Sequence, residues 1–200
     1  MGFKVLIPQY VPESSIQRLH ELGCTIDTGC GSSEADLIAA IGDADAVIAR
    51  TAPYTAAVIK AAKKLKIIAR YGVGVDNIDL EAAAQAGIWV SNTPFSNLGS
   101  VAEHTVGLLL ALAKNFRVAD RELRAGNFNI RSSLTGIDLA GKTIGLIGMG
   151  RIGSMVAKKC ALGLDMHVLA YDPYLTPDKV PLGVELSADW DHVFSTADVI

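Results

Sequence analysis

The sequence predicts an α/β protein built from two doubly wound domains, each with a parallel β-sheet. Two observations predict this fold class. Short β-branched runs alternate with helical segments through the first ninety residues, and a glycine-rich turn between a strand and a helix opens a second unit near residue 148. The strand-like runs are apolar without strict alternation, as expected when helices cover both faces of a parallel sheet. The first domain is expected to be complete before Pro94.

The elements of the first domain follow in regular order. Each expected strand is a short apolar run, and each expected helix is a segment between two such runs. Strands are expected over 4–8, 25–28, 45–49, 66–71 and 88–92, and helices over 13–22, 33–41, 55–65 and 79–86.

One long helix is expected after the first domain, beginning near Ser100. Ser100 and Glu103 have the spacing of a capping box, in which each side chain pairs with a backbone N–H at the helix start. The helix is apolar on every side over 106–113, so we expect it to be buried within the protein or against a second subunit. A shorter amphipathic helix over 117–125 ends at Gly126, and an irregular stretch follows.

The glycine-rich turn has the order of elements of a dinucleotide-binding unit. A strand over 142–148 leads into a helix over 151–163, and a second strand ends at Asp172. In the GxGxxG spacing, Gly148 permits the tight turn, Gly150 lets the backbone approach a pyrophosphate, and Gly153 allows the helix to pack closely on the strand. An ordinary structural turn is the alternative interpretation.

Three further residues extend this interpretation to NAD. The backbone amides of Arg151 and Ile152 lie at the helix start, where they are expected to face the diphosphate. Asp172 follows Gly153 by nineteen residues, the position at which an acid accepts hydrogen bonds from the adenosine ribose. Because its charge would repel a 2′-phosphate, the sequence favours NAD over NADP.

A second glycine-rich loop, over 69–79, follows a strand of the first domain. It has no third glycine and no helix begins at once, so it is not expected to bind a second dinucleotide. Its turn can instead direct backbone N–H groups outward as a nest for a carboxylate. Arg50 and Arg70 end neighbouring strands at the same edge, which predicts an anion site. A tight turn with two solvated arginines is the alternative.

Four motifs, in this order, resemble the D-isomer-specific 2-hydroxyacid dehydrogenases, most closely the phosphoglycerate dehydrogenase branch of that family. They are "RYGVGVDNIDLEAA", "NTPFSNLGSVAEHTVGLLLALAKN", "DLAGKTIGLIGMGRIG" and "AYDP". The resemblance covers residues 3–200. It implies hydride transfer between NAD(H) and a small 2-hydroxy or 2-keto acid, with phosphoglycerate the first choice. It also implies a flavodoxin-like substrate domain over 1–97 and a Rossmann NAD-binding domain, incomplete at its C-terminal side, over 98–200.

The resemblance also assigns roles to individual residues. It implies that Val73 and Gly74 bind the substrate carboxylate, with Val73 also near the nicotinamide, and that Arg50 and Arg70 hold an anionic substrate. Cofactor binding is implied for Val73, Gly148, Gly150, Arg151, Ile152, Gly153 and Asp172. The long helix resembles the family's dimer helix, so a homodimer is implied.

The catalytic Arg, Glu and His of this family have no counterpart in the sequence. They are expected beyond residue 200, and we expect the chain to be a fragment or a shortened gene product. The four histidines, His20, His104, His167 and His192, do not match the catalytic motif. A non-catalytic NAD-binding sensor, or a dimerisation protein similar to a corepressor, is therefore the alternative function.

Composition excludes other classes of protein. The net charge of −3, without a Lys or Arg run, gives no general attraction to nucleic acid. The most apolar run is far shorter than the ~20 residues of a membrane span. Cys24, Cys30 and Cys160 are too few and too scattered for a disulfide framework, which is typical of the cytoplasm. His20 with Cys24 and Cys30 lacks the spacing of a zinc site, so no metal is expected.

Overall fold

The computed structural model describes residues 2–29 and 31–200. Its contacts divide the chain into two compact units, Met1–Ser96 and Asn97–Ile200, which are described separately below. Both units are α/β, and all strand pairs are parallel, as the sequence predicts. Within the described ranges, none of the helices has the length and apolar character needed to cross a membrane.

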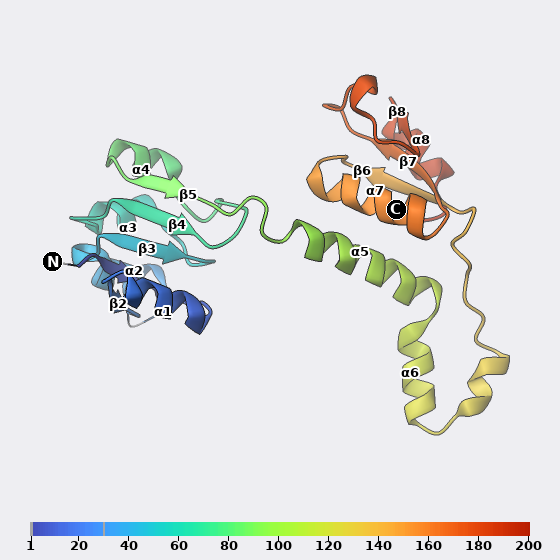
Figure 1. The fold of residues 1–200 in the computed structure, drawn as a ribbon, viewed down its shortest axis with the longest axis horizontal. Coiled ribbons are helices and arrows are strands. Elements are labelled where there is room, and N and C mark those ends of the chain that lie inside the picture. Colours follow the sequence, from blue (N-terminus) through green and yellow to red (C-terminus); the bar gives the residue numbers. More distant parts are fainter. Residues whose placement is uncertain (1, 30) are drawn as a thin grey trace. The chain divides into compact units, whose positions relative to one another are not determined.

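The first unit contains one five-stranded sheet in the order β2-β1-β3-β4-β5 (Figure 1). This is the flavodoxin-like order, so the predicted fold class is confirmed for this unit. The strands are β1 (Lys4–Leu6), β2 (Thr25–Asp27), β3 (Ala46–Ala49), β4 (Ile67–Arg70) and β5 (Trp89–Ser91). The helices are α1 (Glu13–Glu21), α2 (Glu34–Ala40), α3 (Ala56–Ala61) and α4 (Leu80–Gln85).

Helices cover both faces of this sheet. Leu6, Val47 and Ile68 pack on one face with buried residues of α2, α3 and α4. Val5 and Ile7 pack on the other face with partly buried residues of α1. Alternate residues of one strand point to opposite faces, so burial on both faces explains why the strand sequences are apolar without alternation.

The boundary of α3 differs from the prediction. The helix ends at Ala61 rather than near residue 65, and Ala62 has an extended ψ of 102°. Leu65 lies in the core, and the N–H of Lys66 donates to the carbonyl of Asp45 at 2.8 Å. Leaving the helix early therefore brings the chain to the sheet in time to form β4.

Tyr54 is an exception in this apolar core because its hydroxyl is buried without a hydrogen-bond partner among the described residues. Burial raises the pKa of this phenol far above its ordinary value. We expect Tyr54→Phe to raise the free energy of unfolding of the first unit by about 1 kcal/mol, because an unsatisfied buried hydroxyl is removed at nearly constant shape. Urea unfolding, followed by NMR at the amides of β3 and β4, measures the free energy of unfolding of this unit. Tyr10→Phe, at an exposed position, is the matched control, and a destabilised Tyr54→Phe contradicts the prediction.

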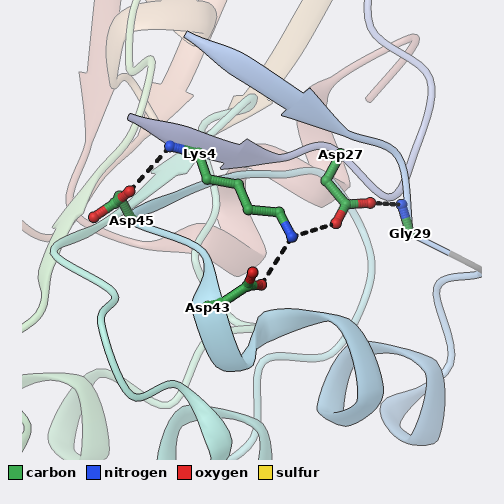
Figure 2. A network of polar contacts seen from close by, with 5 residues as sticks. All are labelled: Lys4, Asp27, Gly29, Asp43 and Asp45. Atoms are coloured by element: carbon green, nitrogen blue, oxygen red, sulfur yellow. Dashed lines mark hydrogen bonds and ion pairs between the residues drawn. The ribbon is translucent and has the colours of Figure 1, made fainter. Parts of the chain in front are cut away.

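An ion network fixes the first strand to its neighbours (Figure 2). The Lys4 ammonium lies 2.8 Å from carboxylate oxygens of both Asp27 and Asp43. The backbone N–H of Lys4 donates to Asp45 at 3.0 Å, and the N–H of Gly29 donates to Asp27 at 2.8 Å. Hydrogen bonds from the Lys4 side chain are the largest cause of the lowered pKa of Asp27 and of Asp43, and their carboxylates raise the pKa of Lys4.

These shifts define the pH range over which the network stabilises the first unit. The two carboxyl pKa values are lower in the folded than in the unfolded chain, so the stabilisation is complete above the ordinary carboxyl range, about 4. We expect it to be lost as the pH falls through the lower folded values. Urea midpoints of β1 and β2 amides, measured by NMR from neutral to acidic pH, test this. Lys4→Met should show a weaker acid dependence, and identical profiles in parent and variant would contradict the prediction.

The second unit contains a three-stranded sheet in the order β6-β7-β8 (Figure 1). Its strands are β6 (Thr143–Ile147), β7 (His167–Tyr171) and β8 (Val184–Ser187). Its helices are α5 (Leu98–Ala113), α6 (Phe116–Arg124), α7 (Arg151–Gly163) and α8 (Trp190–Thr196). On the side of β6 away from β7, Val199 forms a single parallel bridge with Ile144. The strand, helix and strand expected around the glycine turn are confirmed, because β6, α7 and β7 follow one another in that order.

The predicted capping box at the start of α5 is wrong. The helix begins at Leu98, with Asn97 as its N-cap and no side-chain cap in this part of the described chain, so Ser100 lies inside the first turn. Glu103 lies instead 3.6 Å from the ammonium of Lys159, on α7. Ser100 and Glu103 have the spacing of a capping box, but the helix begins at Leu98, two residues before Ser100.

The apolar helix α5 is only partly buried within the second unit. Ala102, Leu109 and Ala113 are buried and belong to the core that also contains residues of α7. Leu108 and Leu112 are 58% and 73% exposed. Of the two expected forms of burial, within the protein or against a second subunit, complete burial within this unit is not observed.

Candidate functional site

The glycine turn between β6 and α7 has the geometry predicted for Gly148 and Gly153. Gly148 has a φ of +98°, a conformation that other residues rarely adopt. At Gly153, a Cβ would overlap the carbonyl oxygen of Gly148, so α7 and the turn can pack this closely only without a side chain. Both positions are therefore required by the local fold.

Gly150 differs from these two glycines because the space beside its Cα is open. A Cβ at this position would meet no atom of the described chain within 4 Å, and the backbone φ of −66° suits any residue. Gly150 is the N-cap of α7 and is exposed, and no side chain of the described residues caps the helix. The open space and the positive end of a thirteen-residue helix together fit an anionic group.

Asp172 lies directly after β7, beside the glycine turn. Its carboxylate accepts hydrogen bonds from the N–H of Met149 at 2.7 Å and from the N–H of Tyr174 at 2.8 Å. These backbone donors, Met149 first, lower the pKa of Asp172, so the carboxylate is ionised at neutral pH. The sequence places Asp172 at this strand end, but its bond to the glycine turn was not predicted. Arg151 and Ile152 lie in the first turn of α7, as expected.

The arginines of the first unit lie where the sequence places them. β3 pairs with β4, with Ala49 opposite Arg70, and Arg50 directly follows β3. Both arginines are therefore at the carboxyl ends of neighbouring parallel strands, where ligands bind in sheets of this type. Val73 and Gly74 are exposed in the loop that follows Arg70.

The two guanidinium groups contact the loops on either side. Arg50 Nη1 donates to the carbonyl of Tyr10 at 3.1 Å, and its guanidinium carbon lies 5.8 Å from the centre of the Tyr71 ring. Arg70 Nη1 donates to the carbonyl of Tyr71. Arg70 Nε is buried and has no hydrogen-bond partner among the described residues. This Nε is therefore an unsatisfied donor within the described part of the first unit.

The glycine-rich loop of the first unit, which contains Val73 and Gly74, is held by hydrogen bonds to its carbonyl groups. The N–H of Thr93 donates to the carbonyl of Gly72 at 2.9 Å, and Asn92 Nδ2 donates to the carbonyl of Val73 at 2.7 Å. No hydrogen bond engages the N–H of Val73 or of Gly74 within residues 2–29 and 31–200. These two N–H groups are the pair that the sequence assigns to a carboxylate, and that assignment stays a prediction. No sequence spacing distinguishes Asn92 from any other loop asparagine, so its role could not be predicted.

None of the four histidines belongs to either of the two glycine-rich segments. They lie on α1, α5, β7 and α8, and all four are exposed. Cys30, which together with His20 and Cys24 lacks the spacing of a zinc site, lies outside the described residues. Burial raises the pKa of the Cys160 thiol.

The second unit has the strand, glycine turn and helix of a Rossmann fold, and the first has a flavodoxin-like sheet, which together define a class of two-domain α/β proteins. The chain belongs to the D-isomer specific 2-hydroxyacid dehydrogenase family, whose catalytic domain it matches over residues 5–199.

Relatives of known name and structure agree with this family. The chain is 43% identical over 199 residues to D-3-phosphoglycerate dehydrogenase of Archaeoglobus fulgidus, covering 98% of this chain and 37% of that relative. The crystal structure of the TT0316 protein from Thermus thermophilus superposes with a TM-score of 0.89 at 34% identity, over 98% of this chain and 63% of that one. D-lactate dehydrogenase from Aquifex aeolicus, complexed with NAD and lactic acid, has a TM-score of 0.81 at 27% identity, over 98% and 59%. The chain thus spans only part of each relative.

Proposed function

We propose that the chain is the substrate- and coenzyme-binding part of an NAD-dependent D-2-hydroxyacid dehydrogenase, with D-3-phosphoglycerate as its first-choice substrate. The observation that carries this proposal is the open N-terminus of α7 at Gly150 next to the ionised carboxylate of Asp172. The named relatives support the choice of substrate, and the NAD complex of the Aquifex aeolicus enzyme supports the choice of cofactor.

The glycine turn fits a dinucleotide. Open space at Gly150 admits a pyrophosphate, and the backbone amides of Arg151 and Ile152 follow it at the helix start. Gly148 and Gly153 keep the turn and α7 in place, and Asp172 accepts hydrogen bonds from the adenosine ribose. When bound, NAD accepts a hydride from the carbon that bears the hydroxyl group of a 2-hydroxy acid.

The substrate-binding loops fit a small molecule with two anionic groups, a carboxylate and a phosphate. We assign the carboxylate to the N–H groups of Val73 and Gly74, with Val73 also beside the nicotinamide, and the remaining negative charge to Arg50 and Arg70. Guanidinium groups and backbone N–H pairs both recognise carboxylate and phosphate oxygens. No residue of this chain is assigned to proton transfer.

Three wider proposals accompany this function. We assign substrate binding to residues 1–97 and NAD binding to residues 98–200. Exposure of Leu108 and Leu112 on α5 supports a homodimer in which a second copy covers this helix. The unpaired Cys24 and Cys160 support a reducing compartment, the cytoplasm.

Titration calorimetry tests the binding function directly. NAD and D-3-phosphoglycerate are each titrated into the purified 200-residue chain. The proposal expects saturable binding of both, with NADP binding more weakly than NAD. Absence of NAD binding would overturn the cofactor assignment, and absence of D-3-phosphoglycerate binding would overturn the substrate assignment. Turnover of NADH with a panel of 2-keto acids distinguishes an enzyme from a non-catalytic NAD-binding protein.

Asp172→Ala should weaken NAD binding by roughly ten-fold and narrow the preference for NAD over NADP. One charged hydrogen-bond acceptor for the ribose and one charge that repels a 2′-phosphate are both removed. Calorimetric titration of the two cofactors into parent and variant measures this preference. Asp178→Ala, at an exposed position of the same unit, serves as the control. Equal NAD affinity in parent and Asp172→Ala would reject the ribose role.

A further inference from the structure

Gln9 lies at the point of the first sheet where the direction of chain winding reverses. The chain passes from β1 to β2 on one side and returns across the sheet to β3 on the other, so β1 and β3 are neighbours. In sheets of this order, ligands bind outside the carboxyl ends of these two strands. Gln9 follows β1, and Arg50 follows β3.

The Gln9 side chain joins these two loops by three hydrogen bonds. Gln9 Oε1 accepts from the N–H of Thr51 at 2.9 Å and from the N–H of Ala52 at 2.9 Å. Gln9 Nε2 donates to Thr51 Oγ1, also at 2.9 Å. One carboxamide therefore fixes two consecutive peptide groups directly after Arg50.

Asn77 holds the same loop from the other side. Its Nδ2 donates to the carbonyl of Ala52 at 2.7 Å and to the carbonyl of Arg50 at 3.2 Å. The residue after Gln9, Tyr10, accepts the hydrogen bond from the Arg50 guanidinium. The backbone and the side chain of Arg50 are thus both held by groups from neighbouring loops.

The Gln9 contacts reach one buried and one exposed residue, because Ala52 belongs to the core of the first unit and Thr51 does not. Thr51 is exposed, and its N–H and hydroxyl could be satisfied by water. A loop fixed in this way places its arginine before a ligand arrives, which reduces the ordering cost of binding. The arginine is held over the Tyr71 ring, next to the glycine loop.

We propose that Gln9 is a positioning residue that sets Arg50 for the anionic substrate. This inference rests on the proposed function, because it takes Arg50 as a substrate-binding group. Gln9 does not itself touch the substrate: it acts through the backbone of residues 50–52.

The test uses Gln9→Met in the 200-residue chain, which keeps the length of the side chain and removes its hydrogen bonds. The expected result is an affinity for D-3-phosphoglycerate about five- to ten-fold weaker, by NMR chemical-shift titration, with unchanged NAD affinity. Gln17→Met is the matched control on exposed α1 and should leave both affinities unchanged. If Gln9→Met does not fold, Gln9→Asn keeps the carboxamide but is one methylene too short to make all three bonds.

A double-mutant cycle with Arg50→Met separates positioning from a general structural effect. If Gln9 acts through Arg50, Gln9→Met should weaken binding less than two-fold when Arg50 is already replaced. A full loss in that background, or equal affinity of parent and Gln9→Met, would overturn the positioning role. Failure of the parent chain to bind D-3-phosphoglycerate would instead overturn the proposed function, so the two failures are distinguishable.

Discussion

Gly150→Val is expected to weaken NAD binding by at least about 100-fold while both units remain folded. A valine side chain at this position meets no protein atom within 4 Å of its Cβ, and its backbone conformation is ordinary. The methyl groups would instead fill the open space at the N-terminus of α7, where the pyrophosphate is expected to approach the backbone amides.

Gly153→Ala provides the contrasting result in the same turn. Its Cβ would overlap the carbonyl oxygen of Gly148, so α7 must move away from the turn. Overpacking of this kind costs about 1–3 kcal/mol, so the second unit should be destabilised even without a cofactor. Calorimetric NAD titration and NMR-monitored urea unfolding of β6 and β7 amides separate the two effects. NAD binding retained by Gly150→Val would mean that the glycine turn has been misinterpreted.

Arg70→Met is expected to lower the affinity for D-3-phosphoglycerate by about 10- to 100-fold, the range for loss of a charge-assisted hydrogen bond. Arg70 ends β4 beside the exposed Val73–Gly74 loop, and its buried Nε has no partner among the described residues. Arg70→Lys keeps the positive charge but has no planar group with several donors, so it should recover only part of the affinity.

The measurement is a chemical-shift titration of D-3-phosphoglycerate into parent, Arg70→Met and Arg70→Lys. Arg18→Met, on the exposed side of α1, removes the same charge elsewhere in the unit and controls for net charge. Equal losses for Arg18→Met and Arg70→Met would show that charge alone, and not the position of Arg70, determines binding. NAD affinity should be the same in all four proteins.

The fold was largely predictable because apolar runs and glycines determine it locally. A strand buried on both faces must be apolar throughout, and Gly148 and Gly153 are required by a φ of +98° and by close packing, respectively. The start of α5 was not predictable in this way. Ser100 and Glu103 have the correct spacing for a capping box, yet the preceding residues are already helical. Capping preferences are small energies that packing readily overrides.

The candidate site was predictable where a residue type is tied to a strand end. Arg70 ends a strand, and Arg50 and Asp172 directly follow strands, so the topology alone brings the two arginines to one edge and the acid beside the glycine turn. Gln9 and Asn92 were not predicted, because a carboxamide in a loop has no characteristic spacing and its partners are distant in sequence. Such contacts depend on how loops meet in three dimensions, which a local pattern does not encode.

The hydrogen bond between Asp172 and Met149 has a consequence for engineering of cofactor preference. A change to alanine removes the charge that opposes NADP but also removes an acceptor that the glycine turn uses. Asparagine would remove the charge and keep an oxygen for the Met149 amide. Redesign toward NADP should therefore start from Asp172→Asn and add a nearby cation, so that the turn keeps its shape while the cofactor selectivity is reversed.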